Sequence, residues 1–314
     1  MRLARLQQLL TLVLLATALG WAGWMASAGR PVLAVVCALL VLGFHALVLG
    51  LEMAVAARVN RDDPAPAASG LQRLRAWWGE VLTAPVVFCW RQPFFPDAVP
   101  DDPGAPGRRG VVLVHGFICN RGLWTPWLRR LRARGIPFVA VNLEPVFGSI
   151  DRYAAVIEQA VRQLEQHTGC APVLVGHSMG GLAIRAWMRD FDGDRRVHRV
   201  LTIGTPHRGT VLARNARTTN ARQMRRDSAW LQQLASQEPA QRYRRFTCFY
   251  GHCDNVVFPA STATLPGADN RHVSATAHVR MAFHREVVNE VLAWLEAPAS
   301  SCESDMAGAT PPTR

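Results

Sequence analysis

The fold is decided by one stretch of the chain, Val173-Leu174-Val175-Gly176-His177-Ser178-Met179-Gly180-Gly181. An apolar run ends in Gly-His-Ser-Met-Gly, and residues typical of a helix follow at once over 182–188. The pattern Gly-x-Ser-x-Gly puts a serine on a strained turn between strand and helix, with its hydroxyl at the end of a parallel sheet. Gly176 and Gly180 would allow a close approach that any Cβ would block. We therefore predict that Ser178 is a nucleophile; a chance match to a short pattern is the alternative.

Strands and helices alternate on both sides of this stretch. Strands are expected over residues 110–115, 137–143, 172–176, 197–203 and 245–250, and helices over residues 123–134, 151–168, 178–190 and 284–295. The apolar runs of the strands are continuous, as in a parallel sheet that helices cover on both faces. This alternation predicts an α/β architecture with a mostly parallel sheet.

The composition limits the classes of partner. The chain of 314 residues has a formal net charge of +12, and its 35 strongly basic side chains are all Arg. This charge suits either a solvated basic surface or attraction to anionic lipid headgroups. The sequence has no helix-turn-helix, zinc-finger or RNP-like pattern, so we expect no nucleic-acid partner. The seven cysteines are scattered and odd in number, which predicts neither a disulfide framework nor a Cys-x-x-Cys metal site.

The first part of the chain contains two long apolar stretches. Residues 6–29 and residues 31–51 contain no Asp, Glu or Arg. Each exceeds the length of about 18 residues that a membrane-spanning helix needs. The turn Gly29-Arg30-Pro31 separates them, so we predict a transmembrane helical hairpin within residues 1–58. A signal peptide is the alternative for the first stretch, because Ala26-Ser27-Ala28 resembles a signal-peptidase site.

Basic residues near the two spans predict their orientation. Arg2 and Arg5 precede the first span, only Arg30 lies in the turn, and four arginines follow the second span at positions 58, 61, 73 and 75. Cytoplasmic flanks carry the excess of Arg. We therefore expect a two-span protein of the bacterial inner membrane whose catalytic domain faces the cytoplasm. A periplasmic domain would require that one stretch does not span.

Residues 59–109 are expected to form a linker and an amphipathic segment. Apolar residues recur at helical spacing within 71–90, namely Leu71, Leu74, Trp78, Val81 and Leu82. We expect this helix to pack on the catalytic domain. The alternative is an interfacial helix that holds Trp77 and Trp78 at the level of the lipid headgroups.

A serine nucleophile needs a base to take its proton and an acid to orient that base. After an elbow of this type, the acid and then the base follow along the chain. The best acid is Asp254, which stands in the turn after the strand expected over 245–250. A turn-forming role is the alternative for this residue, and Asp269 is the reserve acid.

The best base is His278, which lies among small residues shortly before the last helix. His272 and His284 are less suitable, because the first lies in a turn and the second opens that helix. His177 adjoins the serine, but at a sharp turn its side chain must point away from the Ser178 hydroxyl. We therefore expect a buried structural role for His177.

The negative charge that develops on an attacked carbonyl oxygen needs preorganised donors. One is expected to be the N–H of Met179, at the beginning of a helix whose dipole also favours negative charge. The second is expected to be the N–H of Phe117, in the loop after the strand that ends near His115. We expect His115 to shape that loop.

Three pieces of the sequence carry a resemblance to a known family: Leu113-Val114-His115-Gly116-Phe117, the elbow Val175 to Gly181, and Leu201-Thr202-Ile203-Gly204-Thr205-Pro206-His207-Arg208-Gly209. Over about residues 110–295, the chain resembles the bacterial lipase and esterase branch of the α/β-hydrolase superfamily, triacylglycerol-lipase-like. The resemblance implies the α/β-hydrolase fold and carboxylic-ester hydrolysis with a triad of Ser178, Asp254 and His278. The hairpin departs from the usual secreted pattern. No acidic pair for a calcium site is evident, so no metal and no cofactor are predicted.

The resemblance also divides the rest of the chain. Residues 110–296 form the catalytic domain, residues 210–243 stand where the family carries a lid, and residues 297–314 are expected to be a disordered tail. The lid segment combines many arginines with an apolar cluster around Trp230 and Leu234. A mobile cover that meets lipid and an ordinary cap helix both fit this composition.

Together these features predict a membrane-anchored serine ester hydrolase, of the lipase or esterase type, that forms an acyl-enzyme. Lipid or acyl-chain esters are the expected substrates, the bilayer is the expected partner, and no protein partner is predicted. A thioesterase, amidase or acyltransferase could use the same residues, because fold and triad do not fix the leaving group. A non-catalytic, membrane-tethered binding protein is the alternative from another class.

Overall fold

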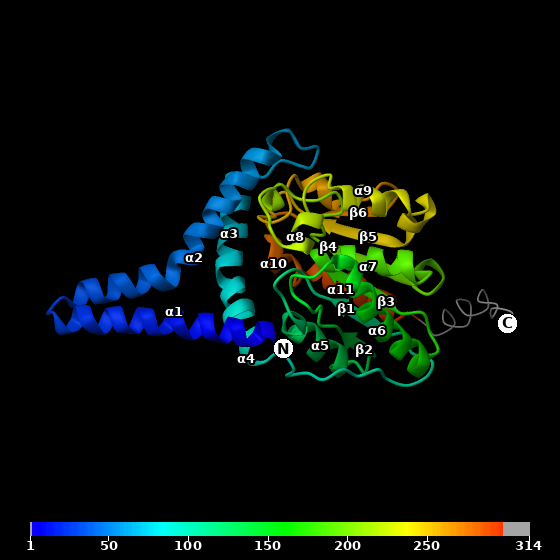
Figure 1. Cartoon of the computed structure of the whole chain (residues 1–314), viewed down its shortest axis with the longest axis horizontal. Coiled ribbons are helices and arrows are strands. Elements are labelled where there is room, and N and C mark those ends of the chain that lie inside the picture. Colours follow the sequence, from blue (N-terminus) through cyan, green and yellow to red (C-terminus); the bar gives the residue numbers. More distant parts are fainter. Residues whose placement is uncertain (1, 298–314) are drawn as a thin grey trace.

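The computed structural model describes residues 2–297 of the chain, so the tail predicted over 297–314 lies almost wholly outside the described residues. Its centre is a six-stranded sheet in the order β2-β1-β3-β4-β5-β6, in which every neighbouring pair is parallel (Figure 1). The strands are β1 (Val111–Val114), β2 (Phe138–Ala140), β3 (Val173–His177), β4 (Arg199–Ile203), β5 (Phe246–Tyr250) and β6 (Asp269–His272). The predicted α/β fold with a parallel sheet is confirmed.

Helices cover both faces of this sheet. Alternate side chains of a strand point to opposite faces. Val112 and Val114 join one core, under α6 (Tyr153–Thr168) and α7 (Met179–Asp190). Val111 and Leu113 join the other core, under α5 (Thr125–Ala133) and α11 (Arg285–Leu295). Each Val or Leu that is fully buried contributes roughly 1.5–3 kcal/mol, so these cores fix the sheet edge on which the site stands.

Strand β6 was not expected from the sequence. Its residues Asp-Asn-Arg-His are polar and at least partly exposed. It forms because it pairs with β5, from Thr247 opposite Asp269 to Tyr250 opposite His272. An edge strand with charged side chains also discourages pairing with another chain.

Two long helices, α1 (Arg2–Ser27) and α2 (Pro31–Val59), precede the sheet. By length and composition, both are able to cross a membrane. They pack against each other as a hairpin that extends away from the sheet, drawn in blue in Figure 1. Near its first turns α1 meets the catalytic domain, since the Gln7 side-chain amide donates to Gln92 Oε1 at 3.2 Å and to the Ile118 carbonyl at 3.3 Å.

A third helix, α3 (Gly70–Pro85), begins with a capping box between Ser69 and Gln72. It continues into η2 (Val86–Arg91) and α4 (Gln92–Phe94). Its small residues Ala76 and Gly79 face inward. Of the apolar stripe that the sequence offered for packing, Val81 is half-buried and the other four residues are exposed. The helix does pack on the domain, but the side that makes this contact is opposite to the one that its apolar residues suggested.

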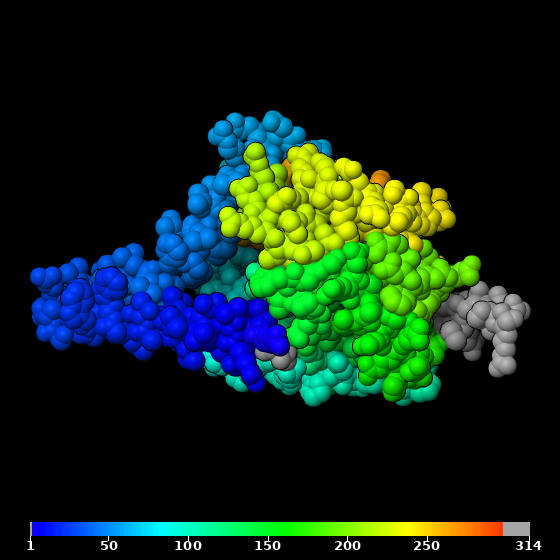
Figure 2. All heavy atoms as spheres, viewed as in Figure 1, coloured from blue at the N-terminus to red at the C-terminus, as the bar shows by residue number. Residues whose placement is uncertain are grey.

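The segment 210–243 packs as a cap against α7, and it is drawn in yellow-green to yellow in Figure 2. It contains η6 (Val211–Ala213), α8 (Thr219–Gln223), α9 (Ala229–Ser236) and the beginning of η7 (Ala240–Arg245). Just after α9, Glu238 forms a buried ion pair with Arg185 of α7 at 2.5 Å. The Trp230 indole donates to both carboxylate oxygens of Asp151 at 3.0 Å. These contacts favour a fixed cap over a mobile cover.

The cysteines differ in one respect from the expectation. Cys170 is disulfide-bonded, which the scattered spacing did not predict. The other described cysteines are free thiols, namely Cys37, Cys89, Cys119, Cys248 and Cys253. The remaining elements of the described chain are α10 (His278–Met281) and the short 3-10 turns η1 (Asn60–Asp62), η3 (Arg121–Trp124), η4 (Ile150–Arg152), η5 (Gly193–Arg195) and η8 (Ala260–Ala263).

Candidate active site

The turn at Ser178 has the strained geometry that the sequence predicts. Ser178 has φ +56° and ψ −127°, between the end of β3 and the first residue of α7. A positive φ is uncommon for a residue with a Cβ, and such strain clusters at functional sites. A Cβ on Gly176 would lie 2.6 Å from the Gly181 nitrogen, and one on Gly180 would lie 2.3 Å from the Val114 oxygen. Both glycines are therefore required for strand β3 to turn directly into α7.

The loop after β1 lies against this serine. A Cβ on Gly116 would lie 2.8 Å from the Ser178 Cβ, so the backbone that leads to Phe117 passes beside the candidate nucleophile. His115 holds the loop, because its Nδ1–H donates to the Gly116 carbonyl at 2.9 Å and its Nε2 accepts from the Leu143 N–H at 3.0 Å. Burial lowers the pKa of His115 to about 4. A neutral, loop-shaping imidazole agrees with the role expected of this residue.

Met179 is the first residue of α7. The first N–H groups of a helix have no partner within the helix, and the dipole there favours negative charge. Phe117 is partly buried and its ring packs against Phe147, with 5.9 Å between ring centroids. The two residues expected to supply oxyanion donors therefore stand on the two backbone segments that adjoin Ser178.

Asp254 and His278 form a buried pair. The Asp254 Oδ2 lies 2.9 Å from His278 Nδ1, and its Oδ1 accepts from the N–H groups of Val256 and Val257 at 2.8 Å each. Burial is the largest single effect and lowers the pKa of His278. The charge and hydrogen bond of Asp254, together with the charges of Glu80 and Glu52, outweigh it and raise this pKa above the ordinary value of 6.5. His278 is the first residue of a short helix, α10 (His278–Met281), rather than part of a loop.

The serine and this pair meet at the carboxyl ends of β3, β4 and β5. The Ser178 N–H donates to the Ile203 carbonyl at 2.8 Å. A Cβ on the next residue, Gly204, would lie 2.8 Å from Asp254 Oδ2 and 3.1 Å from His278 Nδ1. His177 donates from Nε2 to the His278 carbonyl at 3.1 Å. The structure thus brings the three sequence-predicted residues to one point of the sheet edge.

The other histidines and acids have different surroundings. Burial, helped by nearby His278, lowers the pKa of His177 to about 3, so this imidazole is neutral and supports the backbone of His278. His272 bonds His252, with 2.8 Å between their ring nitrogens. Asp269 pairs with Arg271, and His284 immediately precedes α11. Within the described residues, no hydrogen bond or ion pair joins His272, His284 or Asp269 to Ser178, Asp254 or His278.

Two carboxylates of the N-terminal helices were not anticipated. Glu80 of α3 accepts from the N–H groups of Val279 and Arg280 at 2.8 Å and 3.0 Å. Glu52 of α2 accepts from the Asn255 side chain at 2.8 Å, and Asn255 in turn accepts from the His278 N–H at 3.3 Å. The sequence signal for Glu80 was weak: a single acidic residue on the small-residue face of α3.

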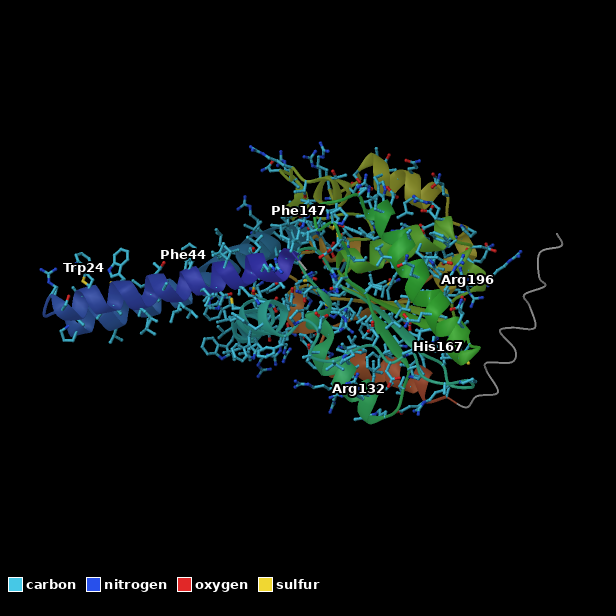
Figure 3. All side chains as sticks on the ribbon, turned by 60° about the horizontal axis from the view of Figure 1, so that its bottom comes forward. Trp24, Phe44, Arg132, Phe147, His167 and Arg196 are labelled. Carbon is cyan, nitrogen blue, oxygen red and sulfur yellow. The ribbon has the colours of Figure 1, made fainter. Side chains whose placement is uncertain are left out.

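The site is closely covered. Ser178 is 6 % exposed and His278 is 4 % exposed. Two apolar side chains near the Phe117 loop, Ile118 and Phe147, are exposed, and Figure 3 shows Phe147 beside the base of the α1–α2 hairpin. Within residues 2–297, no group of three or more His, Cys, Asp or Glu side chains could hold a metal ion.

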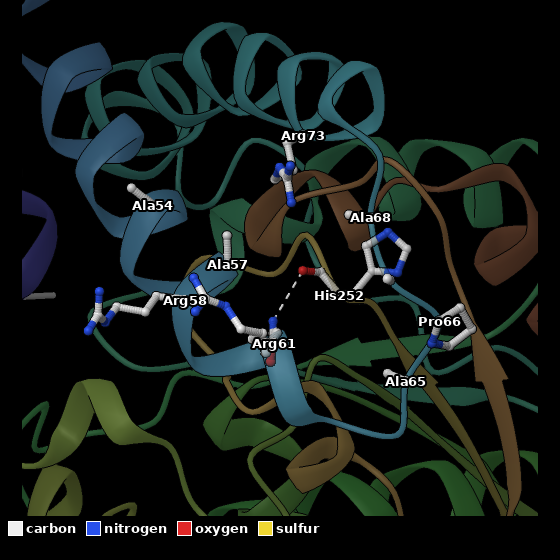
Figure 4. A pocket seen from close by; sticks show the side chains of 11 residues that line it. Ala54, Ala57, Arg58, Arg61, Ala65, Pro66, Ala68, Arg73 and His252 are labelled. Atoms are coloured by element: carbon white, nitrogen blue, oxygen red, sulfur yellow. Dashed lines mark hydrogen bonds between the residues drawn. The ribbon is translucent and has the colours of Figure 1, made fainter.

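A separate cavity of about 530 Å³ lies where the end of α2 and the beginning of α3 meet His252 (Figure 4). His252 and three arginines line it, namely Arg58, Arg61 and Arg73. Its remaining walls are mostly alanine from the end of α2 and from residues 65–68. Positive charge therefore gathers where the hairpin joins the rest of the chain.

Comparisons with known proteins agree with this architecture. The profile described as "Alpha/beta hydrolase family" matches residues 111–312. No curated protein matches the chain in sequence. Among solved structures, the mature form of lipase BlEst2 from Bacillus licheniformis has a TM-score of 0.54 at 18% identity, over 61% of this chain and 94% of that chain.

Two further solved structures are similar to the chain. The propeptide form of the same Bacillus lipase has a TM-score of 0.53 at 18% identity, over 62% of this chain and 52% of that chain. Lipase B of Aspergillus fumigatus has a TM-score of 0.48 at 18% identity, over 55% of this chain and 46% of that chain. At such identities the two Bacillus structures show a shared fold, and fold alone does not assign a substrate.

Proposed function

The chain belongs to the alpha/beta hydrolase family, and on this premise we propose that it is a membrane-anchored serine hydrolase that cleaves carboxylic esters of lipids or acyl chains. One observation carries the proposal: a serine on a strained turn and a buried, hydrogen-bonded pair of Asp254 and His278 adjoin the same backbone at Ile203 and Gly204. A structural pair would not require the adjoining serine to adopt a positive φ. The Gly116–Phe117 backbone beside Ser178 supports the same conclusion.

The proposed reaction proceeds in two halves. The Ser178 hydroxyl attacks the ester carbonyl while His278 takes its proton, and His278 then returns that proton to the leaving alcohol. Water attacks the resulting acyl-enzyme by the same proton transfers and releases the acid. A positioned general base contributes about 10²–10⁴-fold, and Asp254 keeps the imidazole in the tautomer whose Nε2 is free to accept.

The oxyanion of each half would be bound by the N–H groups of Met179 and Phe117. Loss of one such donor reduces kcat by about 10²–10³-fold in hydrolases of this type. No metal or cofactor has a step in this reaction, because the chain's own donors and imidazole suffice for acyl transfer. His177 and His115 stay neutral and hold the backbone on either side of the serine.

We propose that α1 and α2 anchor the enzyme in a bacterial inner membrane, and a lipid substrate follows from that location. The arginines at positions 2, 5, 58 and 61 favour a catalytic domain on the cytoplasmic side. The disulfide at Cys170 opposes this side, since disulfides are rare in the cytoplasm. A topology reporter fused after Arg314 decides: activity only of a reporter that needs the periplasm would overturn the cytoplasmic orientation.

Labelling with a fluorophosphonate probe tests the chemistry. We expect wild type and a matched Ser236→Ala control, whose serine is exposed on α9, to label equally, and Ser178→Ala not to label. Equal labelling of Ser178→Ala, or no labelling of wild type, would favour a non-catalytic binding protein. A series of p-nitrophenyl esters and matched thioesters of increasing chain length then separates an esterase or lipase from a thioesterase.

A further inference from the structure

The outer face of α3 is an apolar stripe that nothing in the chain covers within the described residues. Leu71, Leu74, Trp78 and Leu82 are each 54–57% exposed. Their spacing of three or four residues puts them on one side of the helix. A helix of a soluble domain normally turns such a stripe toward the core. Here the core side is instead made of small residues, and a large apolar surface remains outside.

The stripe lies opposite to the face that contacts the catalytic domain. Successive residues of a helix are about 100° apart, so Trp78 stands roughly half a turn away from Ala76 and Glu80, which are buried. Beyond the helix, the exposed side chains of Val86 and Trp90 continue the apolar surface. The surface is therefore a long ribbon, directed away from the sheet.

This ribbon adjoins the apolar hairpin. The Trp77 indole donates to the Ala46 carbonyl of α2 at 2.8 Å, and His45 of α2 bonds the Val81 carbonyl at 3.1 Å. In Figure 1, α3 stands between the α1–α2 hairpin and the catalytic domain, and Figure 3 shows Trp24 and Phe44 projecting from the hairpin. The stripe and the proposed spans thus form one continuous apolar surface.

Positive charge stands at the beginning of the stripe. Four exposed arginines lie where α2 ends and α3 begins, at positions 58, 61, 73 and 75. Three of them line the alanine-walled cavity of Figure 4, and none of the side chains that line it is acidic. An arginine near an anionic membrane surface contributes about 1 kcal/mol of attraction. The charge complements lipid phosphates and not an acyl chain.

We propose that the outer face of α3 lies on the surface of an anionic phospholipid bilayer, with the arginines at its beginning against lipid phosphates. The proposal rests on the anchoring by α1 and α2 proposed above. This orientation would put His278 near the membrane surface, because His278 begins α10 and the inner face of α3 contacts α10. A second copy of the chain, or another protein, is the rival occupant of the stripe.

Photocrosslinking of the full-length protein in nanodiscs tests this surface without any turnover. Benzoylphenylalanine replaces Trp78 or, as the control, His167, which Figure 3 labels on the far side of the domain from the hairpin. We expect lipid adducts at position 78, at least tenfold more than at 167. Adducts to a second copy, or equal lipid yields at both positions, would overturn the proposal. Failure of the protein to enter nanodiscs at all would instead refute the anchoring.

Charge is tested with discs that do or do not contain phosphatidylglycerol. We expect this lipid to increase the adduct at position 78 severalfold in wild type. The increase should disappear in the double variant Arg58→Gln/Arg61→Gln and persist in the control Arg195→Gln/Arg244→Gln, whose arginines are also exposed. An increase that survives in the first variant contradicts the assignment of these arginines to lipid phosphates.

A different observation, the buried carboxylate on the inner face of α3, carries a second inference. Glu80 is 1% exposed and accepts from the two N–H groups that follow His278 in α10. The Arg280 side chain lies across Gly79, where a Cβ would be 2.7 Å from its Cδ. The base therefore begins a four-residue helix that is held in place by α3.

We infer that Glu80 is a positioning residue that orients the segment of His278 and stabilises its imidazolium. The inference rests on the proposed role of His278 as the base. Three carboxylates act on this imidazole, those of Asp254, Glu80 and Glu52, and His177 packs against it as a neutral ring. Burial raises the pKa of Glu80, whereas the N–H groups of Val279 and Arg280 and the charge of His278 act against this rise. Removal of the Glu80 charge should make protonation of His278 less favourable.

The variant Glu80→Gln keeps the size of the side chain and removes its charge. On a soluble p-nitrophenyl ester we expect kcat to fall about tenfold, as for the loss of one charge-assisted hydrogen bond, with KM little changed. The acidic limb of the pH profile should move to lower pH, because the base then stays neutral in more acidic solution. A merely structural role would lower the Tm and the labelled fraction without moving this limb.

An unmoved limb in a folded, labelled Glu80→Gln protein would overturn the inference. The control Gln72→Ala changes a side chain of the same helix that accepts from the Ser69 N–H at the beginning of the helix, so its acidic limb should coincide with that of wild type. If Ser178→Ala retains full activity, the proposed function itself is wrong. The effect of Glu80→Gln would then not report on a catalytic base.

Discussion

The two halves of the candidate site are held by different parts of the chain. Ser178 is held by its own backbone: a strained turn, Gly176 and Gly180, and the adjoining end of β1. His278 is held by a residue distant in sequence: Glu80 accepts from the N–H of Val279, which lies 199 positions later in the chain. The nucleophile half is therefore complete within the hydrolase fold, whereas the base half also depends on the N-terminal helices.

This difference has a consequence for how the molecule responds to damage. A change at the elbow should affect folding, because backbone atoms of two strands and a helix meet there. A change in the N-terminal carboxylates should spare the fold and alter proton transfer. The following variants separate these outcomes, and they are ordered by the size of the expected effect.

The variant Gly180→Ala should have the largest effect. Its Cβ would lie 2.3 Å from the Val114 oxygen, a backbone atom that cannot move without shifting β1. We expect destabilisation by at least about 3 kcal/mol and loss of fluorophosphonate labelling, measured by thermal unfolding and by gel fluorescence. Gly70→Ala is the matched control, because a Cβ there meets nothing within 4 Å. Normal stability of Gly180→Ala would mean that the turn at Ser178 does not depend on the close approach of Gly180 to β1.

The variant Asp254→Asn should leave the fold intact and remove most of the turnover. An amide can still accept from the Val256 and Val257 N–H groups through its oxygen, but it no longer fixes the tautomer of His278 or stabilises its charge. In serine proteases the equivalent change lowers kcat on the order of 10⁴-fold, and we expect a similar loss here on a p-nitrophenyl ester.

The control for that variant is Asp269→Asn, which changes the reserve acid on β6 and should keep more than about half of the activity, as surface substitutions usually do. A reversed result, with activity lost in Asp269→Asn and kept in Asp254→Asn, would reject the pair of Asp254 and His278.

The wild-type pH profile tests the base half without mutation. His278 must be neutral to accept a proton, and its pKa is raised above 6.5. Activity should therefore fall as the pH drops through a value above 6.5, with one proton taken up. His177 and His115, with pKa values of about 3 and 4, should not contribute above pH 5. A limb well below pH 6 would mean that the base lies elsewhere.

The sequence allowed the nucleophile half to be predicted because its signal is local. The turn at Ser178 needs glycines within a few positions, and the strands around it are continuous apolar runs. Asp254 and His278 could be chosen by their order along the chain and their place after a strand. No local pattern indicates that Glu80 contacts the backbone after His278, because that contact depends on how α3 docks.

Two further differences have the same physical origin. An amphipathic pattern predicts the α3 helix but not the side that faces inward, since an apolar stripe suits a protein core and a bilayer surface equally. Strand β6 has no apolar pattern, because an edge strand of polar residues is held by backbone bonds to β5. In each case the deciding partner is distant in sequence, and propensity gives way to tertiary contact.

The smallest expected effect is that of Glu52→Gln in α2. Glu52 reaches the base only through Asn255, which joins the Glu52 carboxylate at 2.8 Å to the His278 N–H at 3.3 Å. The amide can still accept from Asn255, so we expect kcat on a soluble ester to fall no more than about threefold, the equivalent of a weakened hydrogen bond. Because Glu52 also favours the charged imidazole, the acidic limb should move to lower pH by less than in Glu80→Gln. A larger shift for Glu52 than for Glu80 would mean that α2, and not α3, is the principal support of the base half.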